Sequence, residues 1–143
     1  MKRLLSLFTL LLALWGLLPH SSPALASPAP VDATAYLITP TDGDIVPTTF
    51  PVKFGLVGMG IAPSGVDVEY TGHHHLLVDT PNLPDLAEPL PSTDTVLHFG
   101  AGQTETTLTL APGEHRLQLV LGNYLHIPHT PPVISEPVTI TVQ

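Results

Sequence analysis

The sequence predicts an all-β fold, a single immunoglobulin-like antiparallel β-sandwich of about seven strands. Short segments rich in apolar and β-branched residues recur along the chain, proline and glycine separate them, and no segment has a convincing helical period. Such spacing is typical of β-sandwiches. The clearest strand is residues 115–121, where leucines at 117, 119 and 121 share one parity and Arg116 and Gln118 take the other. This alternation indicates a half-buried strand.

Residues 1–26 have the layout of a secretory signal peptide. Met1-Lys2-Arg3 is positive, a Leu-rich apolar run covers residues 4–18, and Ala24-Leu25-Ala26 is a small-residue cleavage site. The apolar run is shorter than the ~20 residues that a membrane span needs. We therefore predict cleavage after Ala26 and a periplasmic or secreted protein with no membrane span. The alternative is an uncleaved N-terminal anchor.

After this segment, we expect a flexible leader at residues 27–34 and one β-sandwich domain at residues 35–143. The leader contains two prolines and small residues, whereas the domain contains every apolar segment with strand character. In chain order, the predicted strands are residues 35–39, 52–57, 74–79, 96–99, 104–110, 115–121 and 137–142.

Turn residues set the limits of these strands. Asp42-Gly43 follows the first strand, a stretch with five glycines and prolines at residues 58–72 follows the second, and a Pro-rich loop at 80–94 follows the third. Residues 100–103 and 111–113 flank the fifth strand with further glycine and proline. These residue types favour turns because glycine accepts a positive φ and proline fixes φ.

The mature chain is acidic and has no cysteine. Loss of residues 1–26 leaves Lys53 and Arg116 against 12 acidic residues, a formal charge of −10 with neutral histidines. Such a surface repels nucleic acid and attracts cations, so we predict no nucleic-acid partner. Without cysteine, neither disulfides nor thiolate ligands are available.

Histidines are concentrated in the mature chain, and three of them are consecutive at residues 73–75. On a strand, His73 and His75 face one side, ~6.5 Å apart, and His74 faces the other. Imidazole is the commonest transition-metal ligand and suits both copper(II) and zinc. We therefore predict a copper or zinc site, in which the ion is held by His73, His75, His98 and one of His126 or His129.

Four other polar residues receive supporting roles. We expect His74 to lie on the core side of its strand and to form a hydrogen bond there. Gln103 and Glu105 share a strand parity and are predicted to accept hydrogen bonds from the ligand rings. His115 lies on the core side of residues 115–121, so we expect it to fix a corner of the fold by hydrogen bonding and not to bind the ion.

A second function is compatible with the same residues. In this alternative, the protein is a non-catalytic structural or interaction module, and the histidines with Gln103 and Glu105 form a buried hydrogen-bond network. A third hypothesis is pH sensing, because clustered imidazoles repel one another once protonated. The sequence has no nucleophile motif, phosphate loop or dinucleotide fingerprint, so we predict no enzymatic activity.

Three motifs give the chain a resemblance to a known family. They are Gly-His-His-His-Leu-Leu at 72–77, His-Phe-Gly-x-Gly-Gln-Thr-Glu at 98–105 and His-x-Pro-His at 126–129. Together they resemble a family of small exported bacterial proteins, domain of unknown function 4399, over about residues 35–142. The resemblance implies export and a compact β fold, and it implies no activity.

Overall fold

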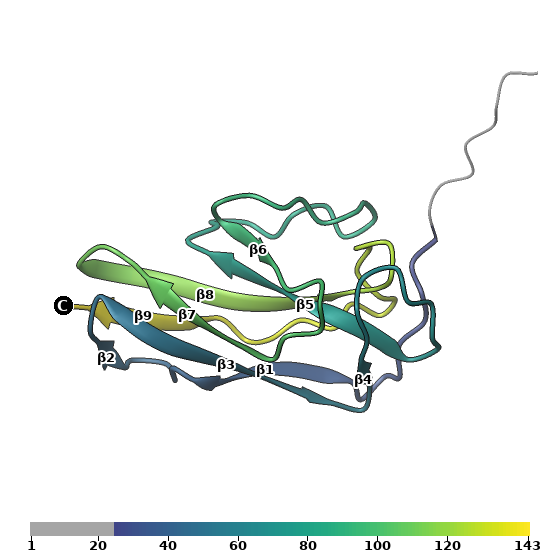
Figure 1. Cartoon of the computed structure of the whole chain (residues 1–143), viewed down its shortest axis with the longest axis horizontal. Coiled ribbons are helices and arrows are strands. Elements are labelled where there is room, and N and C mark those ends of the chain that lie inside the picture. Colours follow the sequence, from purple (N-terminus) through teal and green to yellow (C-terminus); the bar gives the residue numbers. More distant parts are fainter. Residues whose placement is uncertain (1–24) are drawn as a thin grey trace, which may run out of the picture.

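The computed structural model describes residues 25–143, which form two packed β-sheets (Figure 1). Most of the predicted signal peptide, residues 1–24, lies outside the described residues. Within residues 25–143, no helix has the length and apolar character needed to cross a membrane.

The smaller sheet has three antiparallel strands in the order β1-β3-β7. These strands are β1 (Thr34–Thr39), β3 (Thr49–Val57) and β7 (Glu105–Thr109). Tyr36 of β1 pairs with Gly55 of β3, and a Cβ atom at Gly55 would lie 2.1 Å from the Tyr36 ring. Glycine is therefore required at position 55, because the tyrosine ring lies directly over its backbone.

The larger sheet has the order β2-β9-β8-β5-β4, with β6 also paired to β5. β5 pairs with β4 at its start and with β6 further along, so β4 and β6 share one edge of β5. The β2–β9 and β4–β5 pairs are parallel, and the other pairs are antiparallel. The strands are β2 (Ile45–Val46), β4 (Gly60–Ile61), β5 (Thr71–Val78), β6 (Val96–His98), β8 (Gly113–Gly122) and β9 (Val138–Val142).

The predicted all-β sandwich is confirmed, and each of the seven predicted strands has a counterpart. Two further strands, β2 and β4, were not predicted. Each is only two residues long and pairs in parallel with a longer strand, so neither has room for a period-two pattern. β5 also begins three residues earlier than expected, at Thr71.

The main core lies between the two sheets. Alternate residues of β3 and β8 are buried against each other, as the period-two pattern of residues 115–121 predicted. Full burial of each large apolar side chain contributes ~1.5–3 kcal/mol. The largest contributors from β3, β5 and β8 are Phe50, Val52, Phe54, Leu76, Leu117, Leu119 and Leu121.

A second apolar cluster covers the outer face of the larger sheet. Leu77 of β5 and Val120 of β8 point away from the main core and pack with Leu90 and Val96, with Ile134 at the margin. Figure 1 shows the segment between β5 and β6 on the side of β5 and β8 that faces away from β1 and β3. Consequently β5 is covered on both faces, and all its residues after Thr71 are buried.

The leader at residues 27–34 was predicted to be flexible, and this prediction is wrong for the residues around Ala29. Pro28 forms a parallel bridge with Thr130, the amide of Ala29 donates to the Thr130 carbonyl, and the amide of Thr130 donates to the Ser27 carbonyl. The Ala29 side chain is part of the main core. The leader is ordered because these backbone groups pair with the segment that follows β8.

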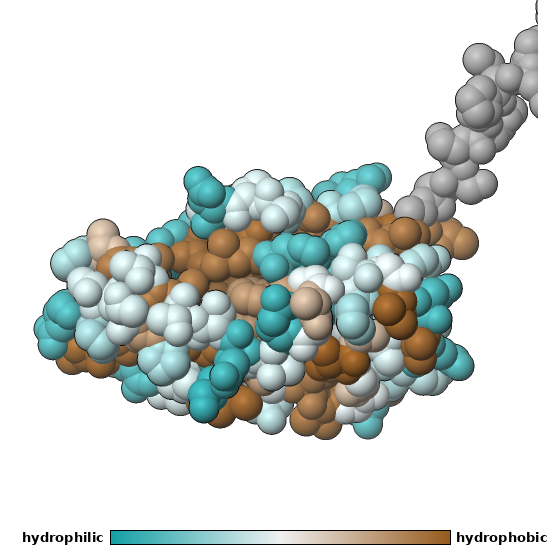
Figure 2. Space-filling view, viewed as in Figure 1, coloured by the Kyte–Doolittle hydropathy of each residue, from teal (hydrophilic) through white to brown (hydrophobic). Residues whose placement is uncertain are grey.

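The outer surface mixes apolar and polar side chains, and Figure 2 shows the two kinds interspersed over the visible face. Tyr36, Ile38 and Val57 are exposed apolar residues of the smaller sheet. Lys53 Nζ and Glu105 Oε2 lie 3.8 Å apart on the same sheet, and both side chains are exposed. A pair of this kind contributes little to stability.

His115 fixes a corner of the fold, as predicted. Nδ1 lies 2.7 Å from Asp79 Oδ2 and Nε2 lies 2.8 Å from the Ala111 carbonyl oxygen, and the protonated ring donates a hydrogen bond to each. The other carboxylate oxygen of Asp79 accepts from the Arg116 amide at 2.8 Å. Because both ring nitrogens face oxygen acceptors, the hydrogen bond to Asp79 raises the pKa of His115, although burial opposes this effect.

Replacing Asp79 by asparagine tests this corner. Because the pKa of His115 is raised in the folded state, the protonated ring stabilises the protein below pH 6.5. This stabilisation is lost as the pH rises through the folded pKa of His115. We therefore expect Asp79→Asn to destabilise the protein by about 1 kcal/mol or less at pH 6, and by less at pH 9. Urea unfolding at both pH values measures the difference. Asp67→Asn, at an exposed position, is the control, and an equal loss at both pH values would contradict the assignment.

Candidate metal centre

The histidine triplet divides between the two faces of β5. His74 lies on the core side, where its ring centroid is 5.2 Å from that of Phe54. His73 and His75 lie on the outer side, and their ring centroids are 4.9 Å apart. In the β5–β6 pair, His75 is directly opposite His98. The alternation of the strand and its register with β6 therefore bring three imidazoles together.

His126 completes a cluster of four rings. It follows β8, and its ring centroid lies 4.7 Å from that of His98 and 5.0 Å from that of His73. The centroids of His75 and His126 are 5.9 Å apart, the largest separation among the six pairs. We call His73, His75, His98 and His126 the histidine cluster.

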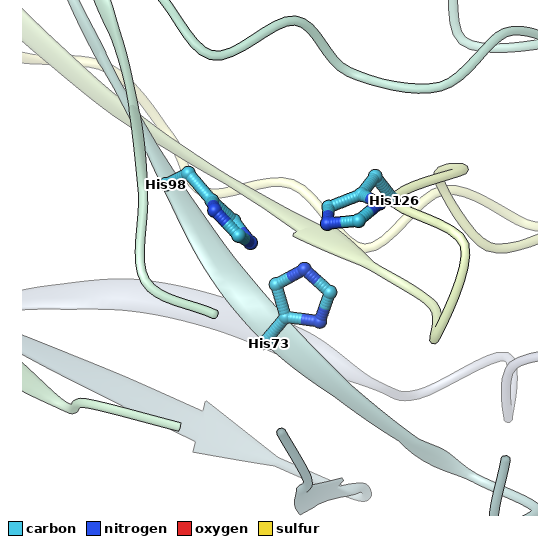
Figure 3. A group of neighbouring side chains, drawn as sticks. All are labelled: His73, His98 and His126. Carbon is cyan, nitrogen blue, oxygen red and sulfur yellow. The ribbon is translucent and has the colours of Figure 1, made fainter. Parts of the chain in front are cut away.

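Three members of the histidine cluster approach the geometry of a metal site. One ring nitrogen each from His73, His98 and His126 lies within 4.8 Å of the other two. Figure 3 shows the three rings turned toward a common point, with His73 on β5 and His126 on the loop after β8. Ligand nitrogens at 2.0–2.1 Å from a tetrahedral zinc ion lie about 3.4 Å apart. The nitrogens would therefore have to approach one another by up to about 1.4 Å to bind one ion in this geometry.

Two glycines leave the space that the rings occupy. A Cβ atom at Gly100 would lie 2.3 Å from His98 Cε1, and one at Gly122 would lie 2.8 Å from His75 Cε1. Real Cβ atoms do not approach so closely, so any larger residue would displace these rings. The backbone on either side of the histidine cluster is thus adapted to imidazoles at these positions.

The loop after β8 holds His126 in a defined conformation. His126 has a positive φ of 70°, which is uncommon outside glycine. Buried Asn123 stabilises this loop, because its Oδ1 accepts from the amides of Leu125 and Ile127, at 2.9 and 3.0 Å. The Asn123 carbonyl accepts from the His126 amide. The position of His126 is therefore fixed by the backbone.

A serine from a third segment contacts the same ring. Ser64 Oγ lies 3.0 Å from His126 Nε2. The amide of Ser64 donates to the Gly100 carbonyl, and the amide of Gly65 donates to the Tyr124 carbonyl. The segment between β4 and β5 is thereby tied to both segments that supply the partly exposed rings of His98 and His126.

Most ring nitrogens in this region have no hydrogen-bond partner. Within residues 25–143, this holds for both nitrogens of His73 and His74 and for Nε2 of His98. Backbone groups lie near the other two rings, because His73 partly offsets the lowered pKa of His75, and Ser27 and Pro28 partly offset that of His129. A buried polar group without a partner costs ~1–3 kcal/mol. The hydrogen-bond network of the structural alternative would require side-chain partners for His73, His74 and His98, and no hydrogen-bond partner for either nitrogen of His73 or His74, or for Nε2 of His98, is found among the described residues.

Burial and mutual repulsion keep His73, His75 and His98 neutral. Burial, with a smaller effect from the neighbouring rings, lowers the pKa of His73 to about 4 and that of His75 to about 3. Burial also lowers the pKa of His98, with a smaller effect from His126. A neutral imidazole carries a lone pair on one nitrogen. His73, His75 and His98 are therefore able to bind a cation at neutral pH without first losing a proton.

His129 does not join the histidine cluster, although it was a candidate ligand. The ring is buried, and a Cβ atom at Gly72 would lie 2.9 Å from its Nε2. Gly72 alternates with His73 along β5, so His129 lies toward the opposite face of the strand. The His-x-Pro-His spacing does not bring both rings to one point, because the chain turns at His126.

The three predicted supporting residues also lie elsewhere. His74 points away from the histidine cluster, and neither of its nitrogens has a partner among the described residues, so the predicted hydrogen bond is absent. Gln103 Oε1 accepts from the Ala101 amide. Glu105 pairs with Lys53 on the smaller sheet. Neither supports the ligand rings, because strand parity does not specify which sheet a segment joins.

Sequence reasoning missed Ser64, Asn123, Gly100 and Gly122. Gly100 lies two residues after His98, and Gly122 lies four residues before His126. Glycine inside a strand pattern indicates that another group approaches the backbone closely. Asn123 followed by a tight loop is a turn signal. No signal in the sequence indicated Ser64, since its contact with His126 spans 62 positions.

Comparison with known proteins gives a family and a distant structural similarity. Residues 52–143 match the family described as Domain of unknown function (DUF4399). A solved structure described as Clostridium thermocellum CbhA fibronectin(III)-like modules is 10% identical over 76% of this chain and 93% of that chain, with a TM-score of 0.35. No curated protein matches. The resemblance carried by the three motifs is thus confirmed.

The lowered pKa values predict that the metal-free protein is destabilised by acid. When the folded pKa lies below the unfolded value of 6.5, the unfolded chain binds protons first, so stability falls as the pH drops from 6.5 toward 4. Between pH 7 and pH 5, His73, His74 and His75 each contribute a loss of about 2 kcal/mol. Urea unfolding in EDTA measures this loss.

His74→Leu provides the matched variant, because it removes one buried imidazole beside Phe54 and leaves the histidine cluster intact. We expect the variant to lose less stability on acidification than the unchanged protein. Equal stability of the unchanged protein at pH 7 and pH 5 would contradict the neutral state of the rings.

Proposed function

The chain belongs to the family described as Domain of unknown function (DUF4399), and from its histidine cluster we propose that it binds one transition-metal ion, copper(II) or zinc. His73, His98 and His126 are the proposed ligands, with His75 adjacent as a further donor. One observation carries the proposal. Ring nitrogens from three separate segments lie within 4.8 Å of one another, and neither nitrogen of buried His73, the central member, has a hydrogen-bond partner among residues 25–143.

The donor chemistry favours these metals. Imidazole nitrogens suit copper(II) and zinc, whereas magnesium and calcium prefer oxygen ligands. The sequence has no cysteine, so thiolate is not available to select copper(I) or iron–sulfur clusters. Because burial lowers the pKa of His73 and His75, a cation does not compete with protons at neutral pH.

We further propose that the protein acts outside the cytoplasm, in the periplasm or as a secreted protein. The charge, apolar run and cleavage site of residues 1–26 support this location. The mature chain has a formal charge of −10 with neutral histidines, which attracts cations to its surface.

Metal binding is tested with untagged protein purified without a nickel column. We expect isothermal titration to give one copper(II) or zinc ion per chain, and the double variant His98→Ala/His126→Ala to lower the affinity at least ~100-fold. Both side chains are partly exposed, so the variant is expected to fold. His115→Gln, which removes a histidine at the Asp79 corner, is the control. An absence of stoichiometric binding, or equal losses in both variants, would refute the proposal.

Gly100→Ala tests the shape of the site without removing a ligand. The added methyl group would lie 2.3 Å from His98 Cε1, so the ring must move away from His73 and His126. We expect the metal affinity to fall about 10-fold, which corresponds to about 1.4 kcal/mol. Gly60→Ala is the matched control, because the nearest atom to its added methyl is Thr71 Cγ2 at 3.3 Å. Unchanged affinity in Gly100→Ala would show that His98 does not bind the ion.

A further inference from the structure

The proposed ligands are all uncharged. The group of closely spaced donors contains His73, His98 and His126 and no carboxylate. Two other acidic side chains have partners elsewhere, since Glu105 pairs with Lys53 and Asp79 with His115. A divalent ion at this site therefore keeps its full charge in a partly buried position, where an uncompensated charge is costly.

The histidine cluster is closed on one side and open on the other. His73 and His75 are 0% exposed, and Gly122 lies against the His75 ring. The rings of His98 and His126 are partly exposed. His75 also lies farthest from His126, at 5.9 Å between centroids. The chain thus supplies buried donors, and among the described His, Asp and Glu side chains only His73, His98 and His126 form the closely spaced group.

A hydroxyl group stands at this opening. Ser64 Oγ is 3.0 Å from His126 Nε2, and Ser64 is partly exposed. Its backbone amide is fixed by the Gly100 carbonyl. A serine hydroxyl both donates and accepts hydrogen bonds, so it is able to donate to an atom bound beside His126.

We infer that the metal ion keeps a coordination position on the solvent side, between His98 and His126, and that this position takes a small anionic ligand. The inference rests on the proposed metal site. The anion would offset the uncompensated charge of the ion, and the Ser64 hydroxyl would donate a hydrogen bond to it. Carboxylate and phosphate share this chemistry, and the experiment separates them.

Copper(II)-loaded protein titrated with azide tests the open position. We expect an azide-to-copper charge-transfer absorption band that saturates at one azide per copper. The band is expected to be absent in His98→Ala/His126→Ala. It is expected to be unchanged in the control Arg116→Gln, which removes one of the two Lys and Arg side chains among residues 25–143. Acetate and inorganic phosphate are then added as competitors, and a raised midpoint of the azide titration identifies the preferred anion.

The outcomes separate this inference from the proposed function. A copper complex of one ion per chain whose spectrum azide leaves unchanged would overturn the open position and leave the metal site standing. An azide band lost in Arg116→Gln would likewise overturn it, since the anion would then be bound at the guanidinium. Failure to bind copper at all would overturn both proposals.

Discussion

The candidate site depends on the burial of β5 on both of its faces. A strand of a sandwich usually has one face on the core and one in water, but here loops cover the outer face and create a second apolar cluster around Leu77 and Val120. His73 and His75 are consequently buried on the outer side. Removal from water keeps these rings neutral, and the register with β6 places His98 beside them.

This arrangement is unfavourable for stability unless something compensates. Buried imidazoles without partners cost free energy in the folded state, and the described residues leave both nitrogens of His73 unpaired. A ligand that binds only the folded protein would offset the cost by mass action. The loop at Asn123 fixes the backbone of His126, and the glycines at 100 and 122 leave the space that the rings of His98 and His75 occupy. Side chains that lower the stability of the folded protein, yet are held in place before a ligand binds, are typical of binding sites.

Much of the fold was predictable from local sequence, because period-two alternation and turn residues act over a few positions. The seven predicted strands, the shared face of His73 and His75, and the corner formed by His115 all follow from such patterns. The errors concern pairing between distant segments. The leader joins Thr130, Glu105 joins Lys53 on the smaller sheet, and Ser64 reaches His126 across 62 positions. Strand parity gives the direction of a side chain but does not identify the segment that it meets.

X-ray absorption spectroscopy of the zinc-loaded protein tests the central claim most directly, because it reports which atoms surround the ion. The account predicts three or four nitrogen donors at about 2.0–2.1 Å, together with the outer-shell scattering that imidazole rings produce. A first shell dominated by oxygen, without imidazole scattering, would mean that carboxylates or carbonyls elsewhere bind the ion. The histidine cluster would then have no role in holding a metal.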